Sequence, residues 1–171
     1  MKLDTLRIKI NELISQYYAD GDKVSSKFIP GKSHISVTGK SINEKEIQYA
    51  VEACLDGWFT SGRFSKKFEK NFAKYMDQRF CSLTNSGSSA NLLALSSLTS
   101  NSLGNKRLKP GDEVITVAAG FPTTVNPIIQ NNLIPVFLDI NKIDLGIDCS
   151  LLEQAMSPKV KAVMLAHTLG N

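Results

Sequence analysis

Residues 110–139, PGDEVITVAAGFPTTVNPIIQNNLIPVFLD, decide the fold. A Pro-Gly-Asp turn leads into the short apolar run Glu113–Val117, and a second apolar run follows at Ile134–Leu138. Both runs have the length of strands, and residues 123–131 between them have the length and apolar spacing of a helix. A strand, a helix and a second strand in this order connect parallel neighbours in a sheet. The stretch therefore predicts an α/β fold, with a mostly parallel sheet and helices on both faces.

The flanking sequence continues this alternation on both sides. We expect further strands at 80–84 and 160–166, and a buried helix at 88–99. A capping-box pattern, Ser150-Leu-Leu-Glu153, predicts one more short helix. Upstream of residue 80 the apolar spacing indicates helices instead of strands. The first expected helix covers 6–18, and the second opens with the capping-box pattern Ser41-Ile-Asn-Glu44. A third has the apolar stripe Phe68, Phe72, Tyr75 and Met76.

Composition places the chain among ordinary globular proteins. Its 171 residues are 42% apolar and 21% charged, which is enough for one domain with a core. The net charge of +4 arises in residues 1–75, where Lys and Arg outnumber Asp and Glu by 13 to 9. This mild excess fits an anionic ligand or a solvated helical surface, and it predicts no nucleic-acid partner.

The start of the chain and its cysteines indicate a compartment. The first residues are charged and amphipathic instead of forming the apolar core of a signal peptide, and no apolar run reaches membrane-spanning length. Cys54, Cys81 and Cys149 are far apart, with no metal-binding or disulfide spacing. We therefore expect reduced thiols in a cytoplasmic protein with no membrane partner.

The sequence TNSGSSAN at 84–91 is the first candidate site. A strand that runs through a Gly-Ser turn into a helix points free backbone N–H groups and hydroxyls at one place. Gly87 leaves room for an anion such as a phosphate to approach the backbone. Plain N-capping, for which Ser and Asn are preferred, explains the same residues and is the favoured interpretation of this motif taken alone.

An aromatic side chain follows the strand at 113–117. Phe121, in AAGFPTTVN, stands between this strand and the next helix, where it could stack on a flat ring or belong to the core. Ligands of doubly wound sheets bind at the carboxyl ends of the strands, where Phe121 and the terminal His167-Thr-Leu-Gly-Asn171 are expected to lie.

In order and spacing, these signals resemble the DegT/DnrJ/StrS family of sugar aminotransferases and dehydrases, which have the aspartate aminotransferase fold. The matching stretches are GWFTSG (57–62), FE…FA (68–73), SGSSA (86–90), PGDEVI (110–115), GFPTT (120–124), PVFLD (135–139) and HTLG (167–170). The resemblance implies two parts: a helix with an extended arm at 1–40, and an incomplete large domain of the type I pyridoxal-phosphate-dependent fold at 41–171.

Four details, SSAN, AAGFPTTVNP, DGWFTSGRF and HTLGN, are similar to one branch of that family. That branch contains the CDP-4-keto-6-deoxyglucose 3-dehydrases of lipopolysaccharide O-antigen synthesis. The resemblance implies pyridoxal or pyridoxamine 5′-phosphate as the cofactor, and a nucleotide-linked 4-keto-6-deoxy sugar as the substrate. It also implies a 2Fe–2S cluster, an iron–sulfur flavoprotein reductase as partner, and a homodimer for the full-length relatives.

The resemblance assigns roles to nine residues. The cofactor phosphate would be held by Gly87, Ser88 and Ser89, with Phe121 stacked on the pyridine ring and Asn171 near the cofactor's edge. The loop near the nucleotide sugar would contribute Thr60, Ser61, Gly62 and Arg63, and Arg63 would contact the diphosphate.

The family's catalytic position, a lysine in the aminotransferases and a histidine in the dehydrases, has no counterpart in residues 1–171. The acidic partner of the pyridine nitrogen and the cluster cysteines also have none, so we assign no catalytic residue and no metal ligand. We expect an N-terminal fragment of a 3-dehydrase that is inactive alone. The alternatives are a fragment of a sugar aminotransferase, or a noncatalytic remnant that keeps a phosphate-binding turn.

Overall fold

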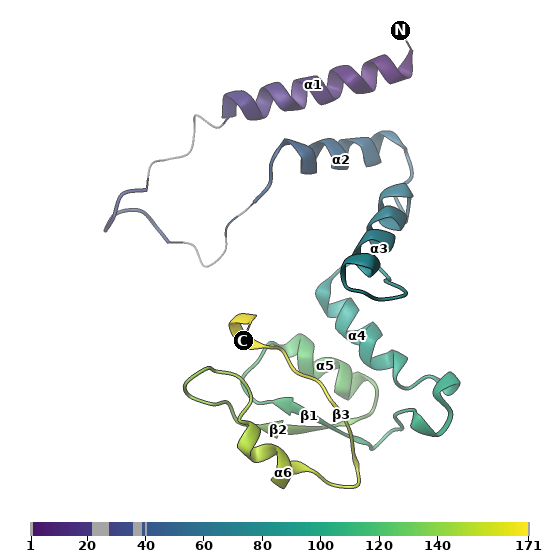
Figure 1. The fold of residues 1–171 in the computed structure, drawn as a ribbon, viewed down its shortest axis with the longest axis vertical. Coiled ribbons are helices and arrows are strands. Elements are labelled where there is room, and N and C mark those ends of the chain that lie inside the picture. Colours follow the sequence, from purple (N-terminus) through teal and green to yellow (C-terminus); the bar gives the residue numbers. More distant parts are fainter. Residues whose placement is uncertain (1, 22–27, 36–38, 40, 171) are drawn as a thin grey trace. The chain divides into compact units, whose positions relative to one another are not determined.

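A computed structural model describes residues 2–21, 28–35, 39 and 41–170 (Figure 1). The chain divides into two compact units, Met1–Cys81 and Ser82–Asn171. The first unit is helical and the second contains the sheet. The division into an arm at 1–40 and a large domain at 41–171 stays a prediction.

Three helices form the first unit: α1 (Leu3–Gly21), α2 (Glu44–Leu55) and α3 (Arg63–Tyr75). The capping box predicted at Ser41 is wrong by two residues. The Asn43 side chain accepts from the backbone N–H of Lys45 at 2.9 Å, and the Glu46 carboxylate accepts from the N–H of Asn43 at 2.7 Å. The sequence holds two overlapping capping patterns, and the second is used. Gly57, at φ +65°, then allows the sharp turn that ends α2.

The sheet of the second unit has three parallel strands in the order β2-β1-β3. They are β1 (Glu113–Val117), β2 (Ile134–Leu138) and β3 (Val160–Val163). The bounds of β1 and β2 are those predicted, and the predicted parallel pairing is confirmed. β3 is shorter than the expected 160–166, because pairing with β1 stops at Val163.

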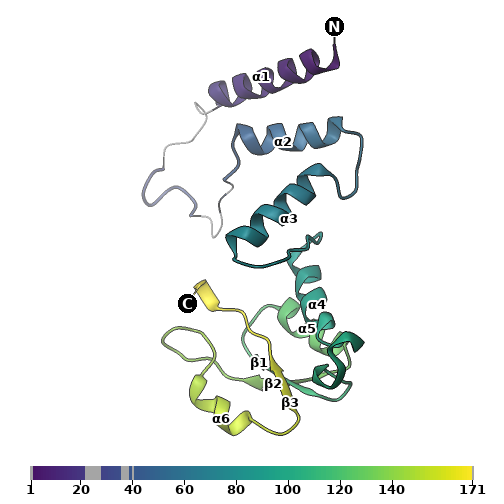
Figure 2. The same ribbon diagram turned by 45° about the vertical axis from the view of Figure 1, so that its right-hand side comes forward.

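Helices lie on both faces of this sheet, as predicted. From β1 the chain passes through α5 (Pro122–Gln130) to β2 on one side, and then through α6 (Leu152–Ala155) to β3 on the other side. Two right-handed crossovers in opposite directions place their helices on opposite faces. Figures 1 and 2 show α5 and α6 on opposite sides of the strands, with α4 (Gly87–Ser97) beside α5.

Two predicted elements differ from the structure. Residues 80–84 form no strand, because a strand exists through its pairing and the described strands pair only with one another. The helix expected to start with a Ser150 cap is instead capped by Asp148, whose carboxylate accepts from the N–H of Ser150 at 2.9 Å. A short 3₁₀ turn, Cys149–Leu151, therefore precedes the four residues of α6.

The core of the second unit lies between β1 and the α4–α5 pair. Its fully buried side chains include Val114 of β1 and Ile128 of α5. Leu95, Leu108 and Leu133 complete the cluster. Alternation along β1 turns Ile115 and Val117, also buried, to the opposite face. Within the described part of the chain, no helix is both long and apolar enough to cross a membrane.

Candidate functional site

The N-terminus of α4 has the geometry of an anion site. Ser86 caps the helix, and its hydroxyl accepts from the N–H of Ser89 at 3.1 Å and contacts the Ser89 hydroxyl at the same distance. Within the described residues, the backbone N–H groups of Gly87 and Ser88 and the Ser88 hydroxyl have no hydrogen-bond partner. These unpaired donors lie at the positive end of a helix of 11 residues.

A second helix starts beside this one. The Asn91 side chain donates to the carbonyl of Thr123 at 3.2 Å, and farther along the Ser96 hydroxyl bonds to the Asn131 side chain. Since residue numbers rise together in both contacts, α4 and α5 run in the same direction and their N-termini lie together. A small hollow of about 150 Å³ lies between the two helices, from the start of α4 along the length of α5. It is lined by Ser88, Ser89, Leu92, Thr123, Asn126, Pro127 and Gln130.

Phe121 lies at the same end of the sheet as this hollow. It is the residue before α5, shortly after the carboxyl end of β1, and its side chain is 71% exposed. Within these 171 residues, Phe121 is therefore not part of the buried core. The structure therefore brings Gly87, Ser88, Ser89 and Phe121 to the carboxyl edge of the sheet, where parallel α/β proteins bind ligands. Their roles in holding a cofactor stay predictions.

The predicted sugar-binding loop forms a hollow of its own in the first unit. Thr60, Ser61, Gly62 and Arg63 all line one cavity of about 490 Å³, together with Trp58 and Lys66. The indole N–H of Trp58 donates to the carbonyl of Ser61 at 3.2 Å and so closes the loop on itself. The four residues therefore lie together, and contact with a nucleotide sugar stays a prediction.

Arg63 is held by the carboxylates of Glu52 in α2 and of Asp56, the residue that follows α2. Its Nε donates to Asp56 at 2.6 Å and its Nη2 to Glu52 at 3.1 Å. Arg7 of α1 binds the same two carboxylates from the other side, at 2.5 Å to Glu52 and 3.2 Å to Asp56. The bond from Arg63 is the main cause that holds the pKa of Asp56 below its usual value, and the bond from Arg7 does the same for Glu52.

These lowered pKa values predict how the contact between α1 and α2 depends on pH. A carboxylate with a lowered pKa stabilises the folded state fully above its ordinary pKa, 4.5 for Glu52 and 3.8 for Asp56, and less as the pH falls through the lowered value. We expect α1 to stay docked from pH 7 to 5 and to loosen below about pH 4. The protection of the α1 amides against hydrogen exchange, relative to the intrinsic rate at each pH, should fall in that range, and in an Arg7→Met variant it should already be lower at pH 7.

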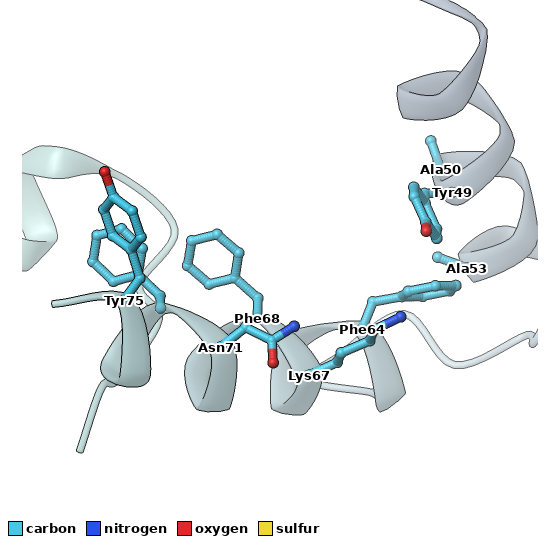
Figure 3. A pocket seen from close by; sticks show the side chains of 9 residues that line it. Tyr49, Ala50, Ala53, Phe64, Lys67, Phe68, Asn71 and Tyr75 are labelled. Atoms are coloured by element: carbon cyan, nitrogen blue, oxygen red, sulfur yellow. The ribbon is translucent and has the colours of Figure 1, made fainter. Parts of the chain in front are cut away.

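An apolar groove lies elsewhere, between α2 and α3. Its volume is about 610 Å³, and Figure 3 shows the aromatic rings of Tyr49, Phe64, Phe68 and Tyr75 along it. Phe68 and Phe72 stack at 5.3 Å between ring centroids. None of the eight predicted site residues that the structure describes lines this groove. Its lining is mostly aromatic and alanine side chains, with Lys67 and Asn71 among them.

Asn171, which was predicted near the cofactor's edge, lies outside the described residues. Cys54, Cys81 and Cys149 are free thiols, and among the described residues no cluster of His, Cys, Asp and Glu could hold a metal ion. Sequence reasoning missed Asn91, which joins the two helix starts, and its place in the SSAN tetrapeptide was the available signal.

The comparison with protein families agrees with this geometry. Residues 40–171 match the model of the DegT/DnrJ/EryC1/StrS aminotransferase family. The chain belongs to this family. The DegT/DnrJ/EryC1/StrS match begins where the predicted arm ends, so α1 lies outside the family model while both hollows lie within it.

Two curated family members are similar over most of the chain. The lipopolysaccharide biosynthesis protein RfbH of Salmonella typhimurium is 54% identical over 100% of this chain, which covers 39% of that protein. The dTDP-4-dehydro-2,6-dideoxy-D-glucose 3-dehydratase of Saccharopolyspora spinosa is 46% identical over 88% of this chain and 32% of its own length. The chain thus spans between about a third and two fifths of these relatives.

Solved structures of the family have the same fold. GDP-4-keto-6-deoxymannose-3-dehydratase, as a mutant with bound GDP-perosamine, has a TM-score of 0.69 at 32% identity, over 76% of this chain and 33% of that one. A protein of Streptococcus pneumoniae described as a sugar aminotransferase, in its PLP form, has a TM-score of 0.70 at 29% identity, over 81% and 33%. The predicted family and the predicted aminotransferase fold are therefore confirmed. The PLP form of the Streptococcus pneumoniae structure agrees with a fold that binds pyridoxal phosphate.

Proposed function

We propose that this chain is the N-terminal part of a nucleotide-sugar 3-dehydratase that depends on pyridoxal or pyridoxamine phosphate and makes 3,6-dideoxyhexoses for O-antigen. One observation carries the proposal: two parallel helix starts meet at the carboxyl edge of the sheet, with unpaired donors on one and an exposed Phe121 before the other. The 54% identity to RfbH supports the lipopolysaccharide context, and the 46% identity to a 3-dehydratase supports the reaction.

The residues at this edge fit the cofactor. The unpaired N–H groups of Gly87 and Ser88 and the Ser88 hydroxyl suit the oxygens of a phosphate ester, which a helix N-terminus favours. Phe121 offers a ring face for stacking on a pyridine. When bound, such a cofactor supplies an electron sink for bonds next to the nitrogen that links it to the substrate. The described residues contribute binding and orientation, and none is assigned the proton transfer.

The substrate would be bound by the hollow at Thr60, Ser61, Gly62 and Arg63. A diphosphate prefers a guanidinium, whose planar donors match two oxygens at once. Arg63 is 55% exposed and therefore able to turn toward such a ligand. The relative with bound GDP-perosamine supports a nucleotide-linked sugar as the ligand class.

The partners and the cluster follow from the family resemblance. A cytoplasmic full-length enzyme would act as a homodimer with an iron–sulfur flavoprotein reductase. The described residues do not fit a 2Fe–2S cluster, since none of their Cys and His side chains form a group able to hold iron. No cluster ligand is therefore proposed within residues 2–170, and we expect residues 1–171 alone to be inactive.

A sugar aminotransferase is the second candidate. The similarity to the Streptococcus pneumoniae protein, with a TM-score of 0.70, favours it as strongly as the fold alone can. Both candidates need the same phosphate site and the same sugar loop. They differ at the catalytic position, which is histidine in the dehydrases and lysine in the aminotransferases.

Binding of pyridoxal phosphate and of pyridoxal by this chain tests the cofactor assignment. We expect weak binding of the phosphate ester and at least about tenfold weaker binding of pyridoxal, because the donors at α4 are matched to an anion. A fluorescence titration at low ionic strength measures both affinities. Equal affinity for the two compounds would contradict a phosphate site at the start of α4.

A further inference from the structure

α1 lies outside the part of the chain that matches the family, which begins at residue 40. Its Arg7 nevertheless pairs with Glu52 and Asp56, the two carboxylates that also hold Arg63. The similarity to RfbH takes in the whole chain, α1 included. The helix therefore belongs to what this chain shares with that relative, and through Arg7, near its start, it reaches the same carboxylates as Arg63 of the predicted sugar loop.

The two arginines donate to the same carboxylate oxygens. Nη2 of Arg63 and Nη1 of Arg7 both donate to Oε2 of Glu52, and both arginines reach Oδ1 of Asp56 at 3.2 Å. Two cations thus face two anions. In the described part of the chain, no other Lys or Arg pairs with either carboxylate. Without Arg7, both negative charges would act on Arg63 alone.

Neighbouring bonds hold Glu52 against α1, while the Arg63 guanidinium also lies over the Phe64 ring, 4.2 Å from its centroid. The Asn11 side chain of α1 donates to the second oxygen of Glu52 at 3.3 Å, and Gln48 of α2 bonds back to α1 at Asn11 and Ser15. The Arg7 side chain is 30% exposed and that of Arg63 is 55% exposed. Of the two arginines, Arg63 is therefore the one that a ligand in solution can reach more easily.

We infer that Arg7 is a positioning residue for Arg63. By neutralising Glu52 and Asp56 from the α1 side, it weakens their hold on Arg63 and lets this guanidinium turn to the diphosphate of a nucleotide ligand. The inference rests on the proposed function through the role of Arg63. It assigns α1 a part in binding the substrate, beyond packing on α2.

The first test is the affinity of the 171-residue chain for CDP, measured by calorimetry. Arg63→Met should lower the affinity, and Arg7→Met should lower it about two- to fivefold, in the range of one exposed ion pair. Arg7→Lys should restore most of the loss, because it returns the charge. Lys9→Met is the matched control, since Lys9 is an exposed α1 residue without a partner among the described residues and its loss changes the net charge equally.

A second test needs no ligand. Hydrogen exchange of the Arg63 Nε–H, which donates to Asp56, is followed by nuclear magnetic resonance. Arg7→Met should slow this exchange, because Asp56 and Glu52 then hold Arg63 more tightly. Asp56→Asn should speed it, and adding Arg7→Met to Asp56→Asn should then have little further effect.

The two tests separate the two ideas. If Arg63→Met binds CDP as the unchanged chain does, Arg63 does not contact the diphosphate and that part of the proposed function is wrong. If Arg63→Met weakens binding while Arg7→Met leaves both CDP affinity and Nε–H exchange unchanged, the inference on Arg7 is wrong and the proposed function stands. Faster Nε–H exchange in Arg7→Met would also overturn the inference.

Discussion

Replacing Ile128 by alanine is expected to destabilise the second unit by about 2–5 kcal/mol. Ile128 is fully buried on α5, in the cluster that includes Leu95 and Val114. Removing three carbons there loses their burial from water and leaves a cavity that the surrounding helices and strand fill only in part. The result should be a loosened sheet, because this cluster joins α4 and α5 to β1.

The measurement should report on the second unit alone, since the chain has two compact units. Amide hydrogen exchange of β1 does this, and a loss of 2 kcal/mol or more corresponds to exchange that is about 30-fold faster or greater. Ile129→Ala is the matched control: the same change in the same helix, at a side chain that is 58% exposed. Equal exchange in the two variants would contradict the described core.

The elements that were predicted correctly are those with local signals at both ends. β1 and β2 are short apolar runs between turn residues, and their bounds were predicted to the residue. The predicted strand at 80–84 was wrong, because strand formation depends on a neighbour that no local pattern specifies. The cap at Asn43 shows another limit: Ser41 and Asn43 are both good caps, and the sequence alone did not rank them.

Part of the candidate site could also be predicted from local signals, and part of it could not. The position of Phe121 follows from strand–helix alternation, and the helix start at Gly87 follows from its Ser86 cap, although the strand expected before it is absent. The charge cluster could not be predicted, because Arg7 lies 45 residues from Glu52 and 49 from Asp56. No spacing rule connects a helix to carboxylates so far along the chain. Sequence reasoning named Arg63 as a ligand contact and did not see that two carboxylates hold it.

Replacing Gly87 by valine is expected to abolish the weak binding of pyridoxal phosphate while leaving the fold intact. Gly87 is the first residue of α4, and a Cβ built there meets no atom within 4 Å. Its φ is not in the left-handed region, so a side chain causes no backbone strain. A branched side chain at this place would therefore occupy open space, which is the space through which a phosphate reaches the N–H groups of Gly87 and Ser88.

The control for this variant is Gly39→Val, since a Cβ at Gly39 also meets nothing within 4 Å and its φ is likewise ordinary. We expect Gly39→Val to bind pyridoxal phosphate as the unchanged chain does, and Gly87→Val to bind it at least about tenfold more weakly, through loss of charge-assisted bonds. Circular dichroism should show equal helix content in all three proteins. If Gly87→Val binds with unchanged affinity, the phosphate does not approach the start of α4, and the cofactor must be held by other residues.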